Sequence, residues 1–291
     1  MANADGPLLA GPGGVLEPTV ARTLLFGLAD ANLGTPTPQH PHEAVTCARC
    51  DTRTDYSRAF IGHLGHYRCP SCAVARPQPA VRAGAISLHG LGGTEALLAL
   101  PEGGVEIALA QPGLHNLYNA LAAASAAVAL GVPAAAIAGG LRATRAPFGR
   151  GEVLHLDGRT VNLLLVKNPV GANVILELLG ADEQPASLHL WLAVNDGVAD
   201  GRDVSWIWDA DFEQLAPLVA AVTCSGQRAA ELALRLKYAG WPLPMAVDRD
   251  LARSFRAALT GAPDRLIALP TYTALLGLRP VLNDHGVTVT D

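Results

Sequence analysis

The sequence has 291 residues, of which 50% are hydrophobic and 16% are charged, and this balance excludes a chain that is disordered throughout. Its length suffices for one large domain or two ordinary ones. A formal net charge of −5 disfavours a protein that binds nucleic acid through a general positive field. No apolar run reaches the roughly 18 residues of a membrane span, and the N-terminus lacks a basic-then-apolar signal. We therefore expect a cytoplasmic protein without a transmembrane segment.

Lysine is rare in this chain, since Lys167 and Lys237 are the only two. A Walker-type phosphate loop requires a lysine directly after a Gly-rich turn. Neither lysine lies in a GxxxxGK[ST] pattern. These 291 residues therefore supply no phosphate loop of that kind.

The first chemical motif along the chain is a CARC…CPSC arrangement with eighteen residues between the two pairs. Two Cys-x-x-Cys turns of this kind place four thiolates around one tetrahedral Zn²⁺. We therefore predict a zinc site, and the alternatives are disulfides, which suit a secreted domain better, or redox pairs. The predicted metal ligands are Cys47, Cys50, Cys69 and Cys72.

The stretch between the pairs, Arg53–Arg68, mixes arginines with Tyr and Phe. Such a ribbon is able to bind nucleic acid by stacking bases on aromatic rings. We favour the simpler interpretation, in which metal stabilises an insertion too small for its own core. His63 and His66 are then expected at the surface or in packing, and Cys224 is expected to be a buried small residue.

Short strands with turns are predicted over residues 81–112, in the runs AISLHGL, EALLALP and VEIALAQPG. An uncharged stretch from His115 to Val132 predicts a helix buried on most sides, which ends at Gly131 and Pro133. A second short helix is predicted from Ala134.

From Val153 onward, predicted strands and helices alternate, which indicates a parallel, three-layer α/β domain of about 140 residues. We expect Ser225 to cap one of these helices and Glu231 to pair with Arg235 four residues later. The strand candidates are VNLLLV, LHLWLAV, LVAAVTCS and RLIALP, and the helix candidates are GANVILELLG, QRAAELALRLKYAG and DLARSFRAALTG.

Three short segments carry polar side chains where ligands commonly bind. His115, Asn116 and Asn119 open an apolar helix, where they either hydrogen-bond a purine or ribose or simply cap the helix. Arg150 lies in FGRGE, where flanking glycines suit a phosphate or carboxylate site or merely a tight turn. Lys167 follows a predicted strand, and the turn that includes Asn168 leads into the next helix, which makes Lys167 a site candidate.

Asn195–Glu213, here called the acidic segment, is the most acidic stretch of the chain. It does not match the EF-hand pattern. Because it also holds Trp206 and Trp208, we favour a partner or substrate surface over a solvated or cation-binding loop. Site and structural roles remain equally open for Thr271, Tyr272 and Thr273. The aspartates of the acidic segment are Asp196, Asp200, Asp203, Asp209 and Asp211.

PGLHNLYNALAAA resembles the adenine-side motif of the Mur ligases. Together with the cysteine pairs, the segments FGRGE, LVKNPVGAN, NDGVADGRDVSWIWDADFE, SGQRAAELALRLKYAG and LPTYTALL resemble the MurT family within them. The resemblance implies an α/β fold: a partial central ATP-binding domain at 1–147, with a zinc ribbon inserted at about 45–75, and a Rossmann-like C-terminal domain at 148–291.

The resemblance also implies a cell-wall ligase that uses ATP and Mg²⁺ to amidate D-glutamate in lipid II at the inner membrane face, with ammonia from a GatD-type glutaminase. On this basis His115, Asn116 and Asn119 lie near adenine, and Arg150 lies near the phosphates. Lys167 and Asn168 lie near nucleotide or substrate. Asp203 completes the partner's Cys–His pair, with Asp209 in reserve.

The chain departs from the family at its start. MANADGPLLAG resembles the family's NADDPL stretch, with Gly6 in place of the second Asp. In the family this stretch lies after the phosphate loop and a magnesium-binding segment. We therefore expect the chain as given to be incomplete for catalysis, and the alternative is a non-catalytic zinc protein that docks a glutaminase.

Overall fold

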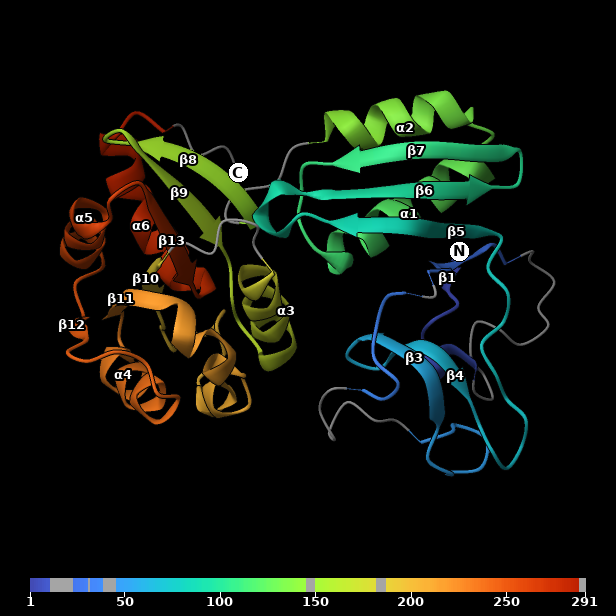
Figure 1. Ribbon diagram of the computed structural model, residues 1–291, viewed down its shortest axis with the longest axis horizontal. Coiled ribbons are helices and arrows are strands. Elements are labelled where there is room, and N and C mark those ends of the chain that lie inside the picture. Colours follow the sequence, from blue (N-terminus) through green and yellow to red (C-terminus); the bar gives the residue numbers. More distant parts are fainter. Residues whose placement is uncertain (11–22, 31, 39–45, 145–149, 182–186, 288–291) are drawn as a thin grey trace. The chain divides into compact units, whose positions relative to one another are not determined.

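The computed structural model describes residues 1–10, 23–30, 32–38, 46–144, 150–181 and 187–287 (Figure 1). The chain divides into two compact units, Met1–Thr144 and Arg145–Asp291. Each unit has its own core of buried apolar side chains. Among the described residues, no helix has both the length and the apolar character needed to cross a membrane.

The first unit is built on a five-stranded sheet in the order β1-β2-β5-β6-β7. β1, β2 and β5 run parallel, and β5, β6 and β7 form an antiparallel meander. The three strands predicted between residues 81 and 112 are confirmed as this meander. The strand bounds are Ala2–Asn3, Leu25–Leu28, Val81–Leu88, Thr94–Leu100 and Gly103–Leu109.

Two helices, α1 (Leu114–Ala129) and α2 (Ala134–Ala143), complete the core of the first unit. The predicted helix is confirmed, and it is buried on most sides as expected. Its exposed positions include His115, Asn119 and Ala123, which recur every four residues as one narrow stripe.

Between β2 and β5 lies the cysteine module, residues 46–75. Its hairpin, β3 (Asp55–Ile61) and β4 (Leu64–Arg68), is antiparallel, and a turn holding one cysteine pair lies on each side of it. Phe60 of the hairpin joins the core of the first unit. His66 packs edge-on against Phe60, and its Nε2 lies 2.9 Å from the carbonyl oxygen of Leu28. The hairpin therefore packs onto the main core of this unit.

A buried carboxylate ties the cysteine module to the rest of the first unit. Asp5 is fully buried and accepts hydrogen bonds from the backbone N–H of Leu28 (2.8 Å) and the hydroxyl of Tyr118 (2.7 Å). It also pairs with Arg76, which directly follows the module and donates to the Leu28 carbonyl at 2.7 Å. A Cβ on Gly27 would lie 2.8 Å from the side chains of both Arg76 and Asp5, so a larger residue at this strand position would displace the Arg76–Asp5 pair.

The second unit contains a six-stranded sheet in the order β12-β11-β10-β13-β9-β8. Five strands run parallel, and the edge strand β8 is antiparallel to β9. The four predicted strands are confirmed, but β8 and β12 were not predicted, and β8 makes the sheet mixed. In sequence order from β8 to β13 the bounds are Arg150–Leu156, Arg159–Leu164, Leu188–Ala193, Val219–Ser225, Ala246–Asp248 and Arg265–Pro270.

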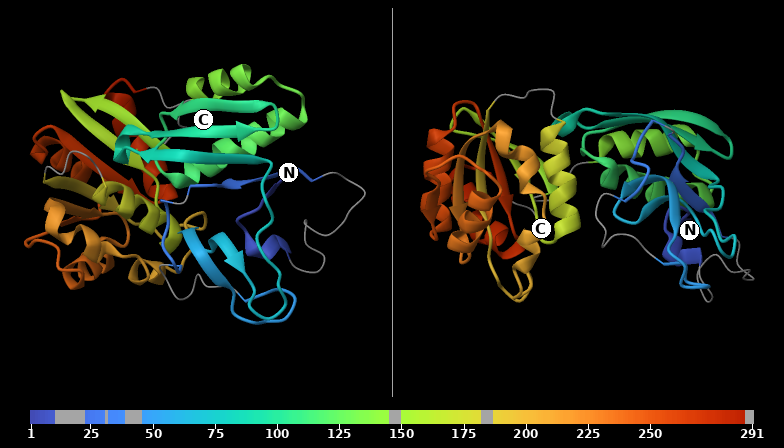
Figure 2. Two further views of the ribbon diagram at one scale, coloured as in Figure 1. Left: turned by 45° about the vertical axis from the view of Figure 1, so that its right-hand side comes forward. Right: turned by 60° about the horizontal axis from the view of Figure 1, so that its bottom comes forward.

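Helices cover both faces of this sheet, and the right-hand view of Figure 2 shows α3 on one side and α5 and α6 on the other. Trp191 and Ala193 of β10 share a core with Phe255 of α5 and with α6. Leu190 and Leu192 of the same strand are also buried and point to the opposite face. The helices are α3 (Pro169–Gly180), α4 (Ala229–Tyr238), α5 (Leu251–Gly261) and α6 (Tyr272–Asp284).

Two local predictions are wrong in this unit. Ser225 does not cap α4, because it ends β11 in the core, where its hydroxyl lies 2.7 Å from that of Ser254. Glu231 pairs with Arg228 at 2.8 Å instead of with Arg235. Arg235 lies on the buried face of α4 and reaches Glu213 at 2.7 Å. Contacts between distant segments therefore decide the partners of Glu231 and Arg235, and their four-residue spacing on the helix does not.

Candidate functional site

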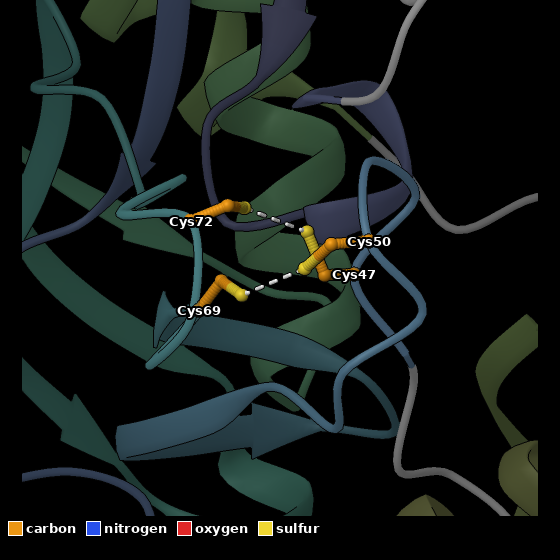
Figure 3. A group of neighbouring side chains, drawn as sticks. All are labelled: Cys47, Cys50, Cys69 and Cys72. Atoms are coloured by element: carbon orange, nitrogen blue, oxygen red, sulfur yellow. Dashed lines mark hydrogen bonds between the residues drawn. The ribbon is translucent and has the colours of Figure 1, made fainter.

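The four predicted ligand cysteines converge at one point of the first unit (Figure 3). Their four Sγ atoms all lie within 4.8 Å of one another. The Cys47 and Cys72 sulfurs are 3.4 Å apart, and those of Cys50 and Cys69 are 3.5 Å apart. Four sulfurs at about 2.3 Å from one Zn²⁺ would be about 3.8 Å apart at tetrahedral angles. The observed spacing fits such an ion.

The two cysteine turns have the same backbone geometry. In each, the N–H of the first cysteine donates to the carbonyl five residues later, from Cys47 to Thr52 (2.8 Å) and from Cys69 to Val74 (2.7 Å). Asp51 and Ala73, which directly follow the second cysteine of each turn, adopt positive φ angles of 54° and 60°. This matched pair of turns directs all four thiols inward.

The surroundings of the cluster favour a closed structural metal site. Cys47 and Cys69 are buried, whereas Cys72 is half-buried and Cys50 exposed. Hydrogen bonding with the side chain and backbone of Thr52 lowers the pKa of the Cys50 thiol to about 6. A backbone hydrogen bond with Val74 lowers the pKa of the Cys72 thiol, but burial and the neighbouring thiols outweigh it and raise that pKa to about 12. Four sulfur ligands leave no open position for a substrate. Cys224 lies elsewhere, buried in the second unit, where burial raises the pKa of its thiol to about 12.

The candidate adenine-side residues lie on the first turns of α1. His115 and Asn119 are exposed, whereas Asn116 is half-buried and donates from Nδ2 to the Pro112 carbonyl at 2.8 Å. The side chain of Asn116 therefore stabilises the entry to the helix. His115 and Asn119 remain accessible to a ligand beside the exposed N–H groups of the helix end.

The cationic candidates belong to the second unit. Lys167 is exposed just beyond the carboxyl end of β9. Asn168 is the N-cap of α3, since its Oδ1 accepts from the Gly171 N–H at 2.8 Å. Arg150 is the first residue of β8, and residues 145–149, which include Phe148 and Gly149 of FGRGE, lie outside the described residues. The predicted nucleotide-binding residues are thus divided between the two units.

Neighbouring strands β10 and β13 end where open α/β sheets commonly bind ligands, because their connections leave toward opposite faces. Here the backbone N–H of Asn195 donates to the Thr271 hydroxyl (3.0 Å), and its Nδ2 donates to the Thr273 hydroxyl (3.1 Å). Asp200 accepts from the Thr273 N–H at 2.9 Å and also bonds its hydroxyl. These polar groups satisfy one another and fix the start of the acidic segment.

The aspartates of the acidic segment differ in their partners. Asp196 binds Arg228 at 2.7 Å, and Asp200 binds Thr273. Asp203 is exposed at the entry to the 3₁₀ turn η4 (Ser205–Trp208), and no cation within the described residues pairs with it. The backbone N–H of Ser205 (2.8 Å), followed by its hydroxyl, holds the pKa of Asp203 below its ordinary value. Asp203 therefore presents an ionised carboxylate to solvent.

The two tryptophans beside Asp203 have different environments. Trp206 is half-buried and lines a small apolar cavity under the segment, together with Leu176 and Leu232. Trp208 is 51% exposed, and its ring centroid lies 6.0 Å from that of Tyr238, which is 71% exposed. One tryptophan thus anchors the segment, and the other forms an exposed aromatic surface with α4.

The residues around the candidate sites that sequence reasoning missed are arginines and polar groups that hold segments together through partners distant in sequence. Arg76, Arg235 and Asn195 each join two or three separate segments. Asn195 directly follows a predicted strand, so its position was a usable signal. Nothing in the local pattern around Arg76 or Arg235 predicts that most of its side chain is enclosed.

Comparison with known proteins identifies similar chains. The family model for the MurT ligase C-terminal region matches residues 165–275. Over 290 residues, 99% of its length, the chain is 32% identical to the MurT subunit of lipid II isoglutaminyl synthase (glutamine-hydrolyzing) from Streptococcus pneumoniae and covers 62% of it. Over 243 residues, 83% of its length, it is 30% identical to the MurT subunit from Staphylococcus aureus and covers 53% of it. The chain thus spans about half to three-fifths of these relatives.

The fold has a counterpart among solved structures. The pseudomurein peptide ligase type C from Methanothermus fervidus superposes with a TM-score of 0.67 at 21% identity, over 97% of this chain and 56% of that protein. This likeness shows a Mur ligase-like α/β fold with mixed sheets. The family-model match over residues 165–275 and the two MurT relatives, independently of this fold likeness, support a MurT-like protein.

Proposed function

We propose that this chain acts as a MurT-type ligase component that amidates the D-glutamate α-carboxyl of lipid II with ammonia from a GatD-type glutaminase. The main support is the 32% identity to a MurT subunit over 99% of the chain. The relative is named as part of a glutamine-hydrolysing lipid II isoglutaminyl synthase. Because the chain covers 62% of that relative, the substrates, the partner and the whole reaction are part of the proposal.

The proposed chemistry makes a poor electrophile reactive. ATP, with Mg²⁺ bound, would donate its γ-phosphoryl group to the carboxylate and leave as ADP, and ammonia would then attack the acyl carbon. Phosphate leaves as the new C–N bond forms, and the nitrogen loses a proton. Cations near the transferred group offset its charge. In this scheme His115, Asn116 and Asn119 contribute to the adenine side, and Arg150, Lys167 and Asn168 to the phosphate or substrate side.

Asp203 is our candidate for the residue that this chain contributes to the partner's glutaminase centre. A carboxylate that accepts a hydrogen bond from the N–H of a catalytic imidazole keeps that ring in the useful tautomer. The exposure of Asp203, its low pKa and its lack of a cationic partner in the described part of the chain all support this role. Trp208 and Tyr238 supply aromatic surface of the kind enriched at protein interfaces beside it.

The role of Asp203 is tested by Asp203→Asn in the complex with the glutaminase. We expect glutamine hydrolysis to fall by at least about 100-fold, since the amide does not hold the imidazole in the same way. Assembly, measured by calorimetric titration, should be unchanged. Asp209→Asn tests the reserve candidate in the same assay, and full glutaminase activity of Asp203→Asn would refute the assignment of Asp203.

The cysteine cluster is proposed to hold one structural Zn²⁺ through Cys47, Cys50, Cys69 and Cys72. The four sulfurs within 4.8 Å of one another and the paired turns support this assignment. The ion would fix the two turns to each other and complete a module too small for an independent core.

A further inference from the structure

Arg235 of α4 is a buried cation whose hydrogen-bond and ion-pair partners all lie in the acidic segment. The residue is 4% exposed. Its Nε donates to the Ile207 carbonyl (3.0 Å), and its Nη2 donates to the Ala210 carbonyl (2.7 Å). Nη1 and Nη2 also form a bidentate ion pair with Glu213, in which they donate to Oε1 at 2.7 Å and to Oε2 at 2.8 Å. One guanidinium therefore holds three points within seven residues of chain.

This arrangement is specific to arginine. The planar guanidinium forms a fork that matches a carboxylate at two points, whereas lysine offers a single compact charge. The guanidinium carbon also lies 5.5 Å from the ring centroids of both Trp208 and Phe212, which places the cation over two aromatic faces. A lysine at 235 would keep the charge but lose the simultaneous contacts to Ile207, Ala210 and Glu213.

The segment that Arg235 holds has little regular structure of its own. Its regular elements are the four-residue turn η4 and the start of the 3₁₀ stretch η5 (Phe212–Leu218), and isolated turns of this length are marginal. Asp203 lies four residues before Ile207, whose carbonyl Arg235 binds. The orientation of the Asp203 carboxylate therefore depends on the contacts that hold η4 against α4. Arg235 makes the hydrogen bonds among these contacts.

We propose that Arg235 is a positioning residue that fixes η4 so that Asp203 and Trp208 face the glutaminase partner in one orientation. The proposal rests on the function proposed above for Asp203. It does not make Arg235 a catalytic residue, because its guanidinium is enclosed by this chain's own groups. It gives the ion pair between the buried Arg235 and the exposed Glu213 a role in ordering the acidic segment.

The test compares Arg235→Lys with Arg253→Lys, a matched control at an exposed arginine that pairs with Asp248 on the same unit. Hydrogen exchange of the full chain should show amides 203–213 exchanging at least about tenfold faster in Arg235→Lys only, with the strands of the sheet unaffected. In the saturated complex, kcat for glutamine hydrolysis should fall about 10- to 100-fold with the KM for glutamine unchanged, since a misplaced group weakens the chemical step.

Two outcomes would overturn the proposal. One is unchanged exchange over residues 203–213, and the other is faster exchange with full kcat in Arg235→Lys while Asp203→Asn is impaired. If Asp203→Asn keeps full activity, the function proposed for Asp203 fails, and the exchange experiment alone decides whether Arg235 orders the segment. If Arg235→Lys does not fold, Glu213→Gln should give a smaller change in the same direction, and its absence would also refute the proposal.

Discussion

The cysteine module and the acidic segment both contain little helix or strand, yet different kinds of contact hold each of them in place. The cysteine module brings four thiols together through two matched turns, so that one metal ion would fix most of its geometry. The acidic segment has no such centre among its described residues, and it is fixed by tertiary contacts, above all by Arg235. Local motifs thus order one region and distant partners order the other.

The two regions nevertheless share one feature, an arginine with at most 10% of its side chain exposed that joins an irregular segment to its unit. Arg76 binds Asp5 and the Leu28 carbonyl, and Arg235 binds Glu213 and the carbonyls of Ile207 and Ala210. A guanidinium suits this position because several N–H donors satisfy separate carbonyls at once. If a metal holds the cysteine module and tertiary contacts hold the acidic segment, loss of the metal should unfold the cysteine module and leave the acidic segment intact.

The largest effect is expected from removing the proposed metal. Elemental analysis of the purified chain should find one zinc per molecule, and Cys47→Ser should abolish it, because structural zinc contributes on the order of 10 kcal/mol to folding small modules. Hydrogen exchange should then become fast across residues 46–75, while the acidic segment keeps its protection. The control is Cys224→Ala, which should retain the zinc. Absence of zinc from freshly reduced wild-type protein would refute the site.

An intermediate effect is expected for Arg76→Met. It leaves the carboxylate of Asp5 buried without its cation, and breaking a buried pair in this way costs about 3–5 kcal/mol. Chemical denaturation of the chain should show this loss in the first unit. Arg68→Met, at an exposed position of β4, is the control and should change stability by less than about 0.5 kcal/mol. Equal stability of the two variants would contradict a structural role for the Asp5 pair.

The smallest effect concerns pH and the acidic segment. The hydrogen bond from Arg235, with a smaller Coulombic contribution from the same cation, lowers the pKa of Glu213 below its usual value of 4.5. A lowered folded-state pKa adds stability above that usual value, and this stability is lost as the pH falls through the folded-state pKa. The exposed aromatic pair Trp208–Tyr238 should therefore report a loosening of the segment by fluorescence at acidic pH. Glu213→Gln should remove this pH response, and a response of equal size in that variant would exclude Glu213 as its source.

Sequence patterns alone predicted the alternating strands and helices of the second unit, the meander, helix α1 and the grouping of the four cysteines. These features depend on local periodicity and on fixed spacing, which are visible in any window of the chain. The edge strands β8 and β12 were missed, because β12 has only three residues and β8 begins in a Gly-rich stretch.

The sequence determined what depends on neighbours in the chain: the helical and strand periods, and two cysteine turns whose spacing alone suits one metal. Only the tertiary structure decided which charges are paired. Glu231 and Arg235 are correctly spaced for each other, but the fold buries Arg235 against Glu213 and leaves Glu231 to Arg228. It likewise pairs Asp196 and leaves Asp203 exposed. The reason is physical: a buried charge must find its partner within a few ångströms in space, and sequence separation does not set that distance.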